Sequence, residues 1–257
     1  MPAGRQGGSQ AQVVNNGFVI KDWAACASGL NSREQWRAWA AQPTLPVGEA
    51  SPAVAEMPAM QRRRLGPLGR LAVQAAWWCQ GDAVGMPLVF ASRYGDAARS
   101  LELFAELARG EPVSPATFSL SVHNAISGMY SIARGDRAAH QAVAAGAGSA
   151  AAALIEALAL LADGAPEVMV VCYDAPLPGA YAQFHDEPAA AYAWAWRVAR
   201  PAANAPYIEL RAGAAAASEA PTAALPFGLD VLRFGLSDDA ALTRQADGTR
   251  WTWRRHA

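Results

Sequence analysis

The sequence predicts an α/β fold in which helices cover a mostly parallel sheet. The first observation is the segment from Ala145 to Asp174, where an amphipathic helix runs through a tight turn into a short apolar strand. The second is a similar apolar run at residues 86–92. The third is the alternation of strand, helix, loop and helix between these two runs. Buried apolar strands that alternate with helices are typical of parallel sheets.

The central helix and strand are defined by two different periodicities. Leucine and isoleucine side chains recur at three- and four-residue spacing between 154 and 161, which predicts a helix with an apolar side. Ser149 stands where an N-cap residue is expected, and Gly164 with Pro166 ends the helix. The run 168–173 is continuous, apolar and rich in β-branched residues, so it predicts a strand that is buried on both faces.

The N-terminal part is expected to begin with a flexible tail at residues 1–10. A strand over 12–20 follows, with a bulge or turn at Asn16 and Gly17. A short helix over 32–39 carries two tryptophans at three-residue spacing, which face inward or face a partner.

Loops and helices occupy the region between this helix and the central segment. We expect a proline-rich connecting loop over 43–58, a largely buried helix over 68–78, and a further helix that begins in the segment 114–125 and runs to about 133. A helix over 99–108 should be amphipathic, with one side formed by Leu101, Phe104, Ala105 and Ala108.

In the C-terminal part, side-chain character alternates with a period of two residues. Alternation over 191–198 and 207–211 predicts two strands of an antiparallel pair. The alanine-rich stretch 213–224 is expected to be a loop or linker, and the residues Asp247–Gly248 predict a hairpin between apolar flanks. Residues 11–257 are thus interpreted as one domain.

Composition excludes several classes of function. With 257 residues, 53% hydrophobic and 17% charged, the chain can bury a sizeable core, and its net charge of -1 gives no field for attracting nucleic acid. No apolar run approaches a membrane span and no signal-peptide core is present, so we expect no membrane insertion. Three cysteines at unrelated spacings predict reduced thiols in a cytoplasmic protein, with no metal site and no cofactor.

Three adjacent arginines, Arg62, Arg63 and Arg64, form the densest positive patch in the sequence. One interpretation is a solvated loop or helix start. The other is a docking point for an anionic group such as a phosphopantetheine-bearing carrier protein.

Four segments carry a resemblance to a known family. MQRRRLGPLGRLA, VFASRYGD, SPATFSLSVHNAISGMYSIARGD and VMVVCYDAPLP, in this order and spacing, resemble the β-ketoacyl-synthase-like N-terminal-domain proteins. Members of that family resemble the chain-length factors of aryl-polyene type II polyketide systems. The resemblance covers roughly 12–235 and implies a thiolase-like half-fold, with a mixed, mostly parallel sheet flanked by helices and an antiparallel C-terminal part.

The resemblance also implies that the catalytic nucleophile has been lost. The wider thiolase-like family places a nucleophilic cysteine at the start of a buried helix, a position that falls at or next to Ala147, and no cysteine stands there. Condensation needs a thiolate that can hold the acyl chain as a thioester. Full ketosynthases also carry histidines in a C-terminal half of the fold that this chain is expected to lack.

Other polar and sulfur-containing residues have structural alternatives to a functional role. His123 and Asn124 stand at a helix start, where capping competes with hydrogen bonding into a cleft, and Cys172 lies in an apolar strand that would make its thiol inert. In the resembled family, the positions of Met129 and Tyr130 line the dimer interface and acyl tunnel, although core packing explains both.

The resemblance therefore implies a non-catalytic, chain-length-factor-like subunit that forms a heterodimer with a complete β-ketoacyl synthase. The acyl carrier protein would be bound through that partner. Two alternatives stay open: a self-sufficient acyl-transferring or hydrolysing enzyme that uses Ser149, Cys172 or His123, and a carrier-protein-docking scaffold.

Overall fold

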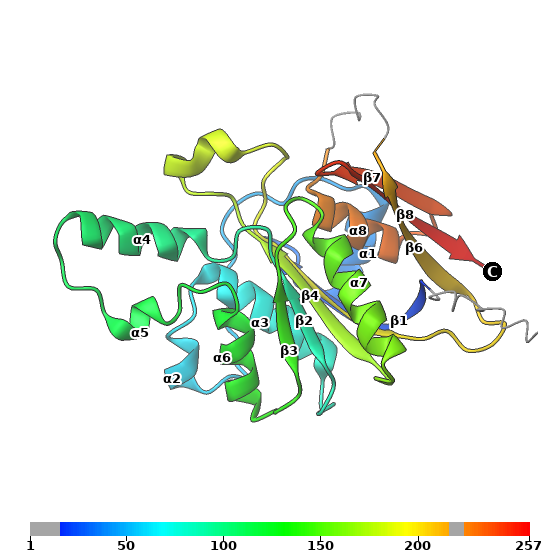
Figure 1. The fold of residues 1–257 in the computed structure, drawn as a ribbon, viewed down its shortest axis with the longest axis horizontal. Helices are drawn as coiled ribbons and strands as arrows, with labels where there is room; N and C mark the ends of the chain where they lie inside the picture. The colour runs from blue at the N-terminus through cyan, green and yellow to red at the C-terminus, as the bar shows by residue number, and fades with distance from the viewer. Residues whose placement is uncertain (1–15, 216–223) are drawn as a thin grey trace, which may run out of the picture.

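The computed structural model describes residues 16–215 and 224–257, which form one mixed eight-stranded sheet with helices on both faces (Figure 1). The strand order is β3-β2-β4-β5-β1-β6-β8-β7. The strands are β1 (Gly17–Ala27), β2 (Leu88–Ala91), β3 (His140–Val143), β4 (Val168–Asp174), β5 (Tyr192–Ala199), β6 (Tyr207–Ala214), β7 (Ala241–Ala246) and β8 (Thr249–His256). The helices are α1 (Arg33–Ala41), α2 (Ala59–Arg62), α3 (Pro67–Gln80), α4 (Ala97–Ala108), α5 (Pro115–Phe118), α6 (Ala125–Arg134), α7 (Ser149–Ala162), the 3₁₀ helix η1 (Gly179–Phe184) and α8 (Phe227–Leu236).

The sheet separates two apolar cores. Helices α3 and α6 pack on one face, and α1, α7 and α8 contribute to the core on the other. Strand β4 serves both cores, since Val170 and Cys172 face α7 and α8 while Val171 and Tyr173 face α3. This double burial explains why the run 168–173 lacks polar alternation.

The α/β fold class is confirmed, but the parallel part of the sheet is smaller than the sequence predicted. Only β3-β2-β4 pair in parallel, and every other pairing is antiparallel. Parallel neighbours need a crossover connection. Helices α4, α5 and α6 provide it between β2 and β3, and α7 provides it between β3 and β4.

The predicted pairing of the two period-two strands is wrong. Strand β1 lies between β5 and β6 and pairs antiparallel with each, so β5 and β6 do not pair and run in the same direction. Period-two alternation predicts a half-buried strand, but it does not predict which other strand lies next to it in the sheet. The tryptophans of β5, Trp194 and Trp196, face α7 and α8, while Ala193 and Ala195 leave room for α3.

The N-terminal strand is also corrected. Within the described residues it spans Gly17–Ala27, beyond the predicted end at residue 20, and its irregularity lies between Ile20 and Asp22. The predicted residues 12–15 lie outside the described part of the chain. The predicted tail at 1–10 lies outside the described residues. Of the predicted loop at 213–224, the first two residues belong to β6.

Two helices show what a sequence pattern does and does not determine. In α1 the side chain of Ser32 accepts a hydrogen bond from the N–H of Gln35 in a capping box, and both tryptophans are buried as predicted. In α4 the predicted apolar side is not covered, because Phe104 is 60% exposed and only Leu103 is buried. Helix α4 extends away from the body of the molecule (Figure 1).

The remaining predictions are confirmed with small changes. The buried helix α3 and the β7–β8 hairpin are present, whereas the single helix expected to run to 133 is divided into α5 and α6. None of the helices in the described ranges has the length and apolar character needed to cross a membrane.

Candidate functional site

The turn between β3 and α7 is where the sequence places the lost nucleophile. Gly146 has φ +52°, a left-handed conformation that favours glycine. The Oγ of Ser149 donates to the carbonyl of Gly146 at 2.7 Å and accepts from the N–H of Ala145 at 3.0 Å. The N-cap is Gly148, so the prediction that Ser149 caps α7 is wrong. Its hydroxyl instead tightens the turn, and it is 2% exposed.

The β7–β8 hairpin lies directly on this turn. A Cβ added to Gly146 would come within 2.2 Å of the Asp247 carboxylate, and one added to Gly148 would lie 3.2 Å from the indole Nε1 of Trp251. Asp247, which has φ +49°, therefore places its carboxylate where a side chain at position 146 would project. The turn carries no reactive side chain, and the hairpin occupies part of the space that one would need.

Ala147 lines an open groove next to the hairpin. The groove has a volume of about 1020 Å³ and lies between the loop 185–188, α8 and β7. Both arginines that line it are paired with carboxylates: Arg244 binds Asp230, which also lines the groove, and Arg233 lies 2.8 Å from Asp239. The methyl group of Ala147 offers no nucleophile to this groove.

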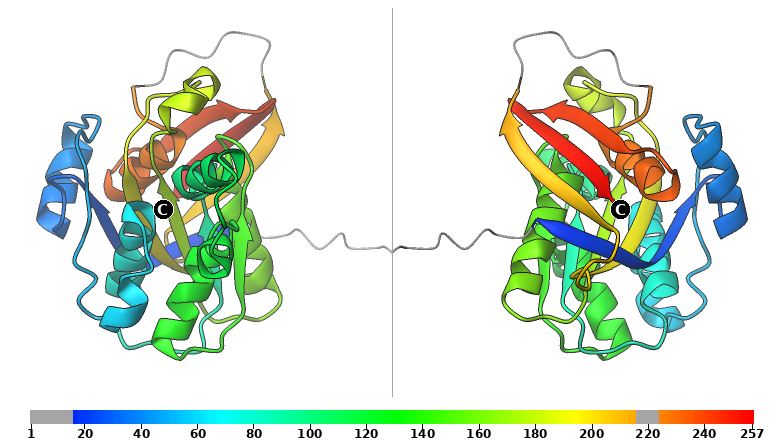
Figure 2. Two further views of the ribbon diagram at one scale, coloured as in Figure 1. Left: turned by 90° about the vertical axis from the view of Figure 1, so that its left-hand side faces the viewer. Right: turned by 90° about the vertical axis from the view of Figure 1, so that its right-hand side faces the viewer.

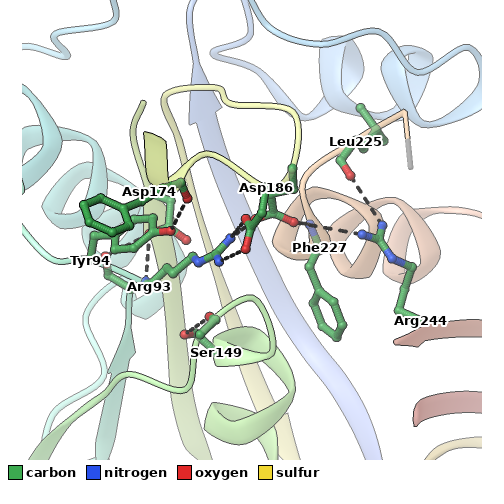
Figure 3. Close-up of polar contacts among 12 residues, drawn as sticks. Arg93, Tyr94, Ser149, Asp174, Asp186, Leu225, Phe227 and Arg244 are labelled. Atoms are coloured by element: carbon green, nitrogen blue, oxygen red, sulfur yellow. Dashed lines mark hydrogen bonds and ion pairs between the residues drawn. The ribbon is translucent and has the colours of Figure 1, made fainter. Parts of the chain in front are cut away.

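A buried carboxyl group stands where β4 ends, beside the groove. Asp174 accepts hydrogen bonds from the Oγ of Ser92 at 2.9 Å and from the N–H of Arg93 at 2.8 Å (Figure 3). Burial raises the pKa of Asp174 to about 7, although these two hydrogen bonds oppose the shift. Asp174 thus ties β4 to the turn that follows β2.

Arg93 ties the same turn to the loop over the groove. Its guanidinium binds the carboxylate of Asp186 and lies 3.6 Å from Glu187, which accepts from the N–H of Phe227 at the start of α8 (Figure 3). The hydrogen bond from Arg93 lowers the pKa of Asp186, whereas burial raises that of Glu187. These ion pairs and hydrogen bonds hold the loop 185–188 in place. None of these charged groups activates a nucleophile among the described residues.

Sequence reasoning missed this polar cluster. Asp174 was noted only as the end of a strand, and Asp186, Glu187 and Arg244 were not singled out. A carboxylate directly after a doubly buried strand is the one signal that the sequence offered for it.

His123 and Asn124 make different contacts, and their predicted place in a substrate tunnel or interface, like that of Met129 and Tyr130, stays a prediction. The Nε2 of His123 lies 2.9 Å from the carbonyl oxygen of Ser92, and its ring lies against Gly95. Asn124 is the N-cap residue of α6, is exposed, and makes no capping hydrogen bond through its side chain. His123 therefore joins the loop before α6 to the turn after β2.

Met129 and Tyr130 are both buried in the core to which α3 and α6 contribute. The exposed fraction is 4% for Met129 and 0% for Tyr130. The hydroxyl of Tyr130 donates to Oε1 of Gln80 at 2.6 Å, and its ring packs edge-on against Trp77. Their role in a substrate tunnel or interface stays a prediction, as these contacts are all within the chain.

The thiols are inaccessible. Cys172 is 1% exposed, and desolvation raises its pKa well above the usual value. Burial raises the pKa of Cys26 and of Cys79 to about 12. A thiol in such surroundings is a poor nucleophile. Within residues 16–215 and 224–257, no group of three His, Cys, Asp or Glu side chains is arranged to hold a metal ion.

The three adjacent arginines are not equivalent. The guanidinium of Arg62 donates to the carbonyl of Val54 at 3.2 Å, whereas Arg63 and Arg64 are exposed. The carbonyl of Arg64 accepts a hydrogen bond from Arg99. Carrier-protein docking at this patch stays a prediction.

The fold is that of a ketosynthase-like α/β protein, and the turn from Ala145 to Ser149 contains no cysteine. A family model of the β-ketoacyl synthase N-terminal domain matches residues 36–254, and the chain belongs to this family. A search of curated protein sequences gives no significant match.

Several solved structures share the fold. One is the ketosynthase ApeO in complex with its chain length factor ApeC from Xenorhabdus doucetiae, with a TM-score of 0.81 and 28% identity over 93% of this chain and 99% of the matched chain. The ishigamide ketosynthase/chain length factor matches with a TM-score of 0.70 at 14% identity, over 93% and 99%. The ketosynthase from module 1 of the bacillaene synthase of Bacillus amyloliquefaciens FZB42 matches with 0.57 at 11% identity, over 80% of this chain and 48% of that one.

The first prediction tests the contact between the hairpin and the turn. Gly146→Ala should lower the free energy of unfolding by about 2 kcal/mol, from left-handed backbone strain plus displacement of Asp247. Gly135→Ala is the matched control, since Gly135 has φ +63° and no atom within 4 Å of its added Cβ. It should lose only about 1 kcal/mol from strain. Denaturant unfolding measures both.

The difference between these two variants should disappear when Asp247→Gly is added, since that change removes the carboxylate and suits the positive φ. Equal losses for Gly146→Ala and Gly135→Ala in the parent chain would mean that Asp247 does not restrict position 146.

The second prediction concerns the ionisation of Asp174. Because the native pKa is raised, the folded state binds more protons than the unfolded state between the unfolded value of about 4 and the folded value of about 7. Stability should therefore fall as pH rises through this window, by at most about 1.4 kcal/mol per pH unit from this group.

Asp174→Asn preserves the shape and the acceptor oxygen but cannot ionise. The difference in unfolding free energy between the parent and this variant, measured from pH 4 to 8, should change steadily up to about pH 7 and then level off. A pH-independent difference would show that folding leaves the pKa of Asp174 unchanged, which would contradict the raised value.

Proposed function

We propose that this chain is a non-catalytic, chain-length-factor-like subunit that forms a heterodimer with a complete β-ketoacyl synthase. It acts in aryl-polyene or fatty-acid-like type II polyketide biosynthesis. The partner performs condensation, and this chain provides one wall of the assembly that limits product length. The acyl carrier protein is bound through the partner, with Arg63 and Arg64 as candidate contacts from this chain.

The observation that carries the proposal is the β3–α7 turn. Acyl transfer to a ketosynthase requires an exposed thiolate at a helix start. Here the turn holds glycine and alanine, its serine hydroxyl is bound to backbone groups, and Asp247 lies over position 146. A chain of this family with such a turn is suited to a non-catalytic role beside a complete ketosynthase.

The lengths of the matched chains support a partner role. The chain aligns over 99% of a chain in each of two ketosynthase/chain length factor structures, and over only 48% of the module 1 ketosynthase. Its size therefore resembles that of one subunit in those two structures and about half of that ketosynthase.

An uncovered apolar surface supports the heterodimer. Phe104 and Leu107 on α4 are 60% and 59% exposed, and Phe118 and Val122, in and after α5, are 62% and 52% exposed. We call these four residues the α4–α5 patch. Helices α4 and α5 lie at the same end of the molecule, away from β6, β7 and β8 (Figure 1). Apolar patches of this kind mark interaction sites, because exposing them to water is unfavourable.

The third prediction tests this surface with the full chain. Co-expression with the ketosynthase encoded nearby should give a 1:1 complex, measured by size-exclusion chromatography with light scattering. Phe104→Glu combined with Leu107→Glu should weaken the complex at least about tenfold, since it places charge in an apolar interface. Val47→Glu is the matched control, because Val47 is 82% exposed in the loop before α2 and should leave binding unchanged.

Product length provides the functional measurement. The ketosynthase with parent chain or Val47→Glu should give one product distribution, and the ketosynthase with the α4 double variant should lose that distribution. If the parent chain stays monomeric beside the ketosynthase and product length does not change, the proposed function is wrong.

A further inference from the structure

The outer face of β6 and β8 brings three arginines around one hydroxyl group. Arg211 on β6 is directly opposite Thr252 on β8, and Arg250 and Arg254 stand two residues to either side of Thr252 on the same face. All three arginines are exposed. In the view onto this side of the molecule, β8 and β6 lie in front and α8 lies behind them (Figure 2).

The positive charges on this face are incompletely balanced. Glu209 is the acidic residue of the cluster, and its carboxylate already binds Arg211 at 2.8 Å and the Nε2 of His256 at 3.1 Å. Arg250 and Arg254 form no ion pair with any described residue. Like charges on neighbouring positions of one sheet face are unfavourable, so a bound anion would stabilise this arrangement.

The same residues surround a hollow of about 220 Å³. Gly213 and Ala212 form part of its lining. The absence of a side chain at Gly213, opposite Arg250, leaves room for the guanidinium of Arg250, which lies 3.7 Å from the position of a Cβ on Gly213. Guanidinium groups bind phosphate oxygens in a bidentate manner, and a threonine hydroxyl donates a further hydrogen bond. The chemistry of the hollow therefore matches a phosphate group.

The surroundings favour a small ligand over a protein partner. Specific protein interfaces have an apolar, well-packed centre inside a polar rim. None of the large apolar side chains that are exposed in the described parts of the chain belongs to β6, β7 or β8. A concave cluster of arginines without an apolar rim is suited to a single anionic group.

We propose that this hollow, formed by Arg211, Arg250, Arg254 and Thr252, binds the phosphate group of a small soluble phosphate ester. The site lies outside the groove next to Ala147 and shares no lining residue with it. The proposal does not depend on the chain-length-factor role.

The test measures binding and thermal stability of the full chain with inorganic phosphate and with glycerol 3-phosphate, against chloride at equal ionic strength. Both phosphates should raise the unfolding midpoint above that in chloride. Arg250→Gln combined with Arg254→Gln should weaken binding at least about tenfold in calorimetry. Arg37→Gln combined with Arg137→Gln, which removes two exposed arginines elsewhere, is the charge-matched control and should bind like the parent.

A second readout needs no ligand. In chloride, the Arg250/Arg254 double variant should unfold at a higher temperature than the parent, because the repulsion among the arginines is reduced. The proposal is overturned if phosphate gives no stabilisation beyond chloride, if the double variant keeps the full effect, or if only a phosphopantetheine-bearing carrier protein binds and the two small phosphates do not.

Discussion

The packing of the β7–β8 hairpin on the β3–α7 turn is the constraint on which the rest of this structure depends. Asp247 and Trp251 lie against Gly146 and Gly148, so the C-terminal part of the chain occupies part of the space around the turn where the sequence predicts the lost nucleophile. The fold keeps a helix start beside a buried strand at this place. It uses them as a scaffold, because the side chains that remain there are bound to backbone or absent.

Burial on both faces of the sheet explains how this scaffold is held together around a turn that carries no thiol. The large residues of β5, Trp194 and Trp196, pack under α7 and α8, and Asp174 and Arg93 fix the loops at the end of β4. These contacts hold the turn in place without any help from a catalytic residue. Helix α4 is covered less by the described chain, since Phe104 and Leu107 on it are exposed, and this exposure is what the proposed partner interface rests on.

Local pattern predicted much of the fold, and distant contacts determined the rest. Helix α7 and strand β4 could be located because their apolar periodicity reflects burial by adjacent elements, and the hairpin followed from Asp247 and Gly248. The insertion of β1 between β5 and β6 could not be predicted, since it joins the two ends of the chain. The same holds for the contact of Asp247 with Gly146. Amphipathicity located α4 correctly but could not show that no part of the described chain covers it.

The most direct test of the central claim is the intact mass of the purified chain after incubation with an excess of an acyl thioester. The account predicts an unchanged mass, because the three cysteines are buried and Ser149 is bound to the turn, while a complete ketosynthase treated in parallel gains one acyl group. A stable covalent acyl adduct on this chain, located at Ser149 or at any cysteine, would contradict it.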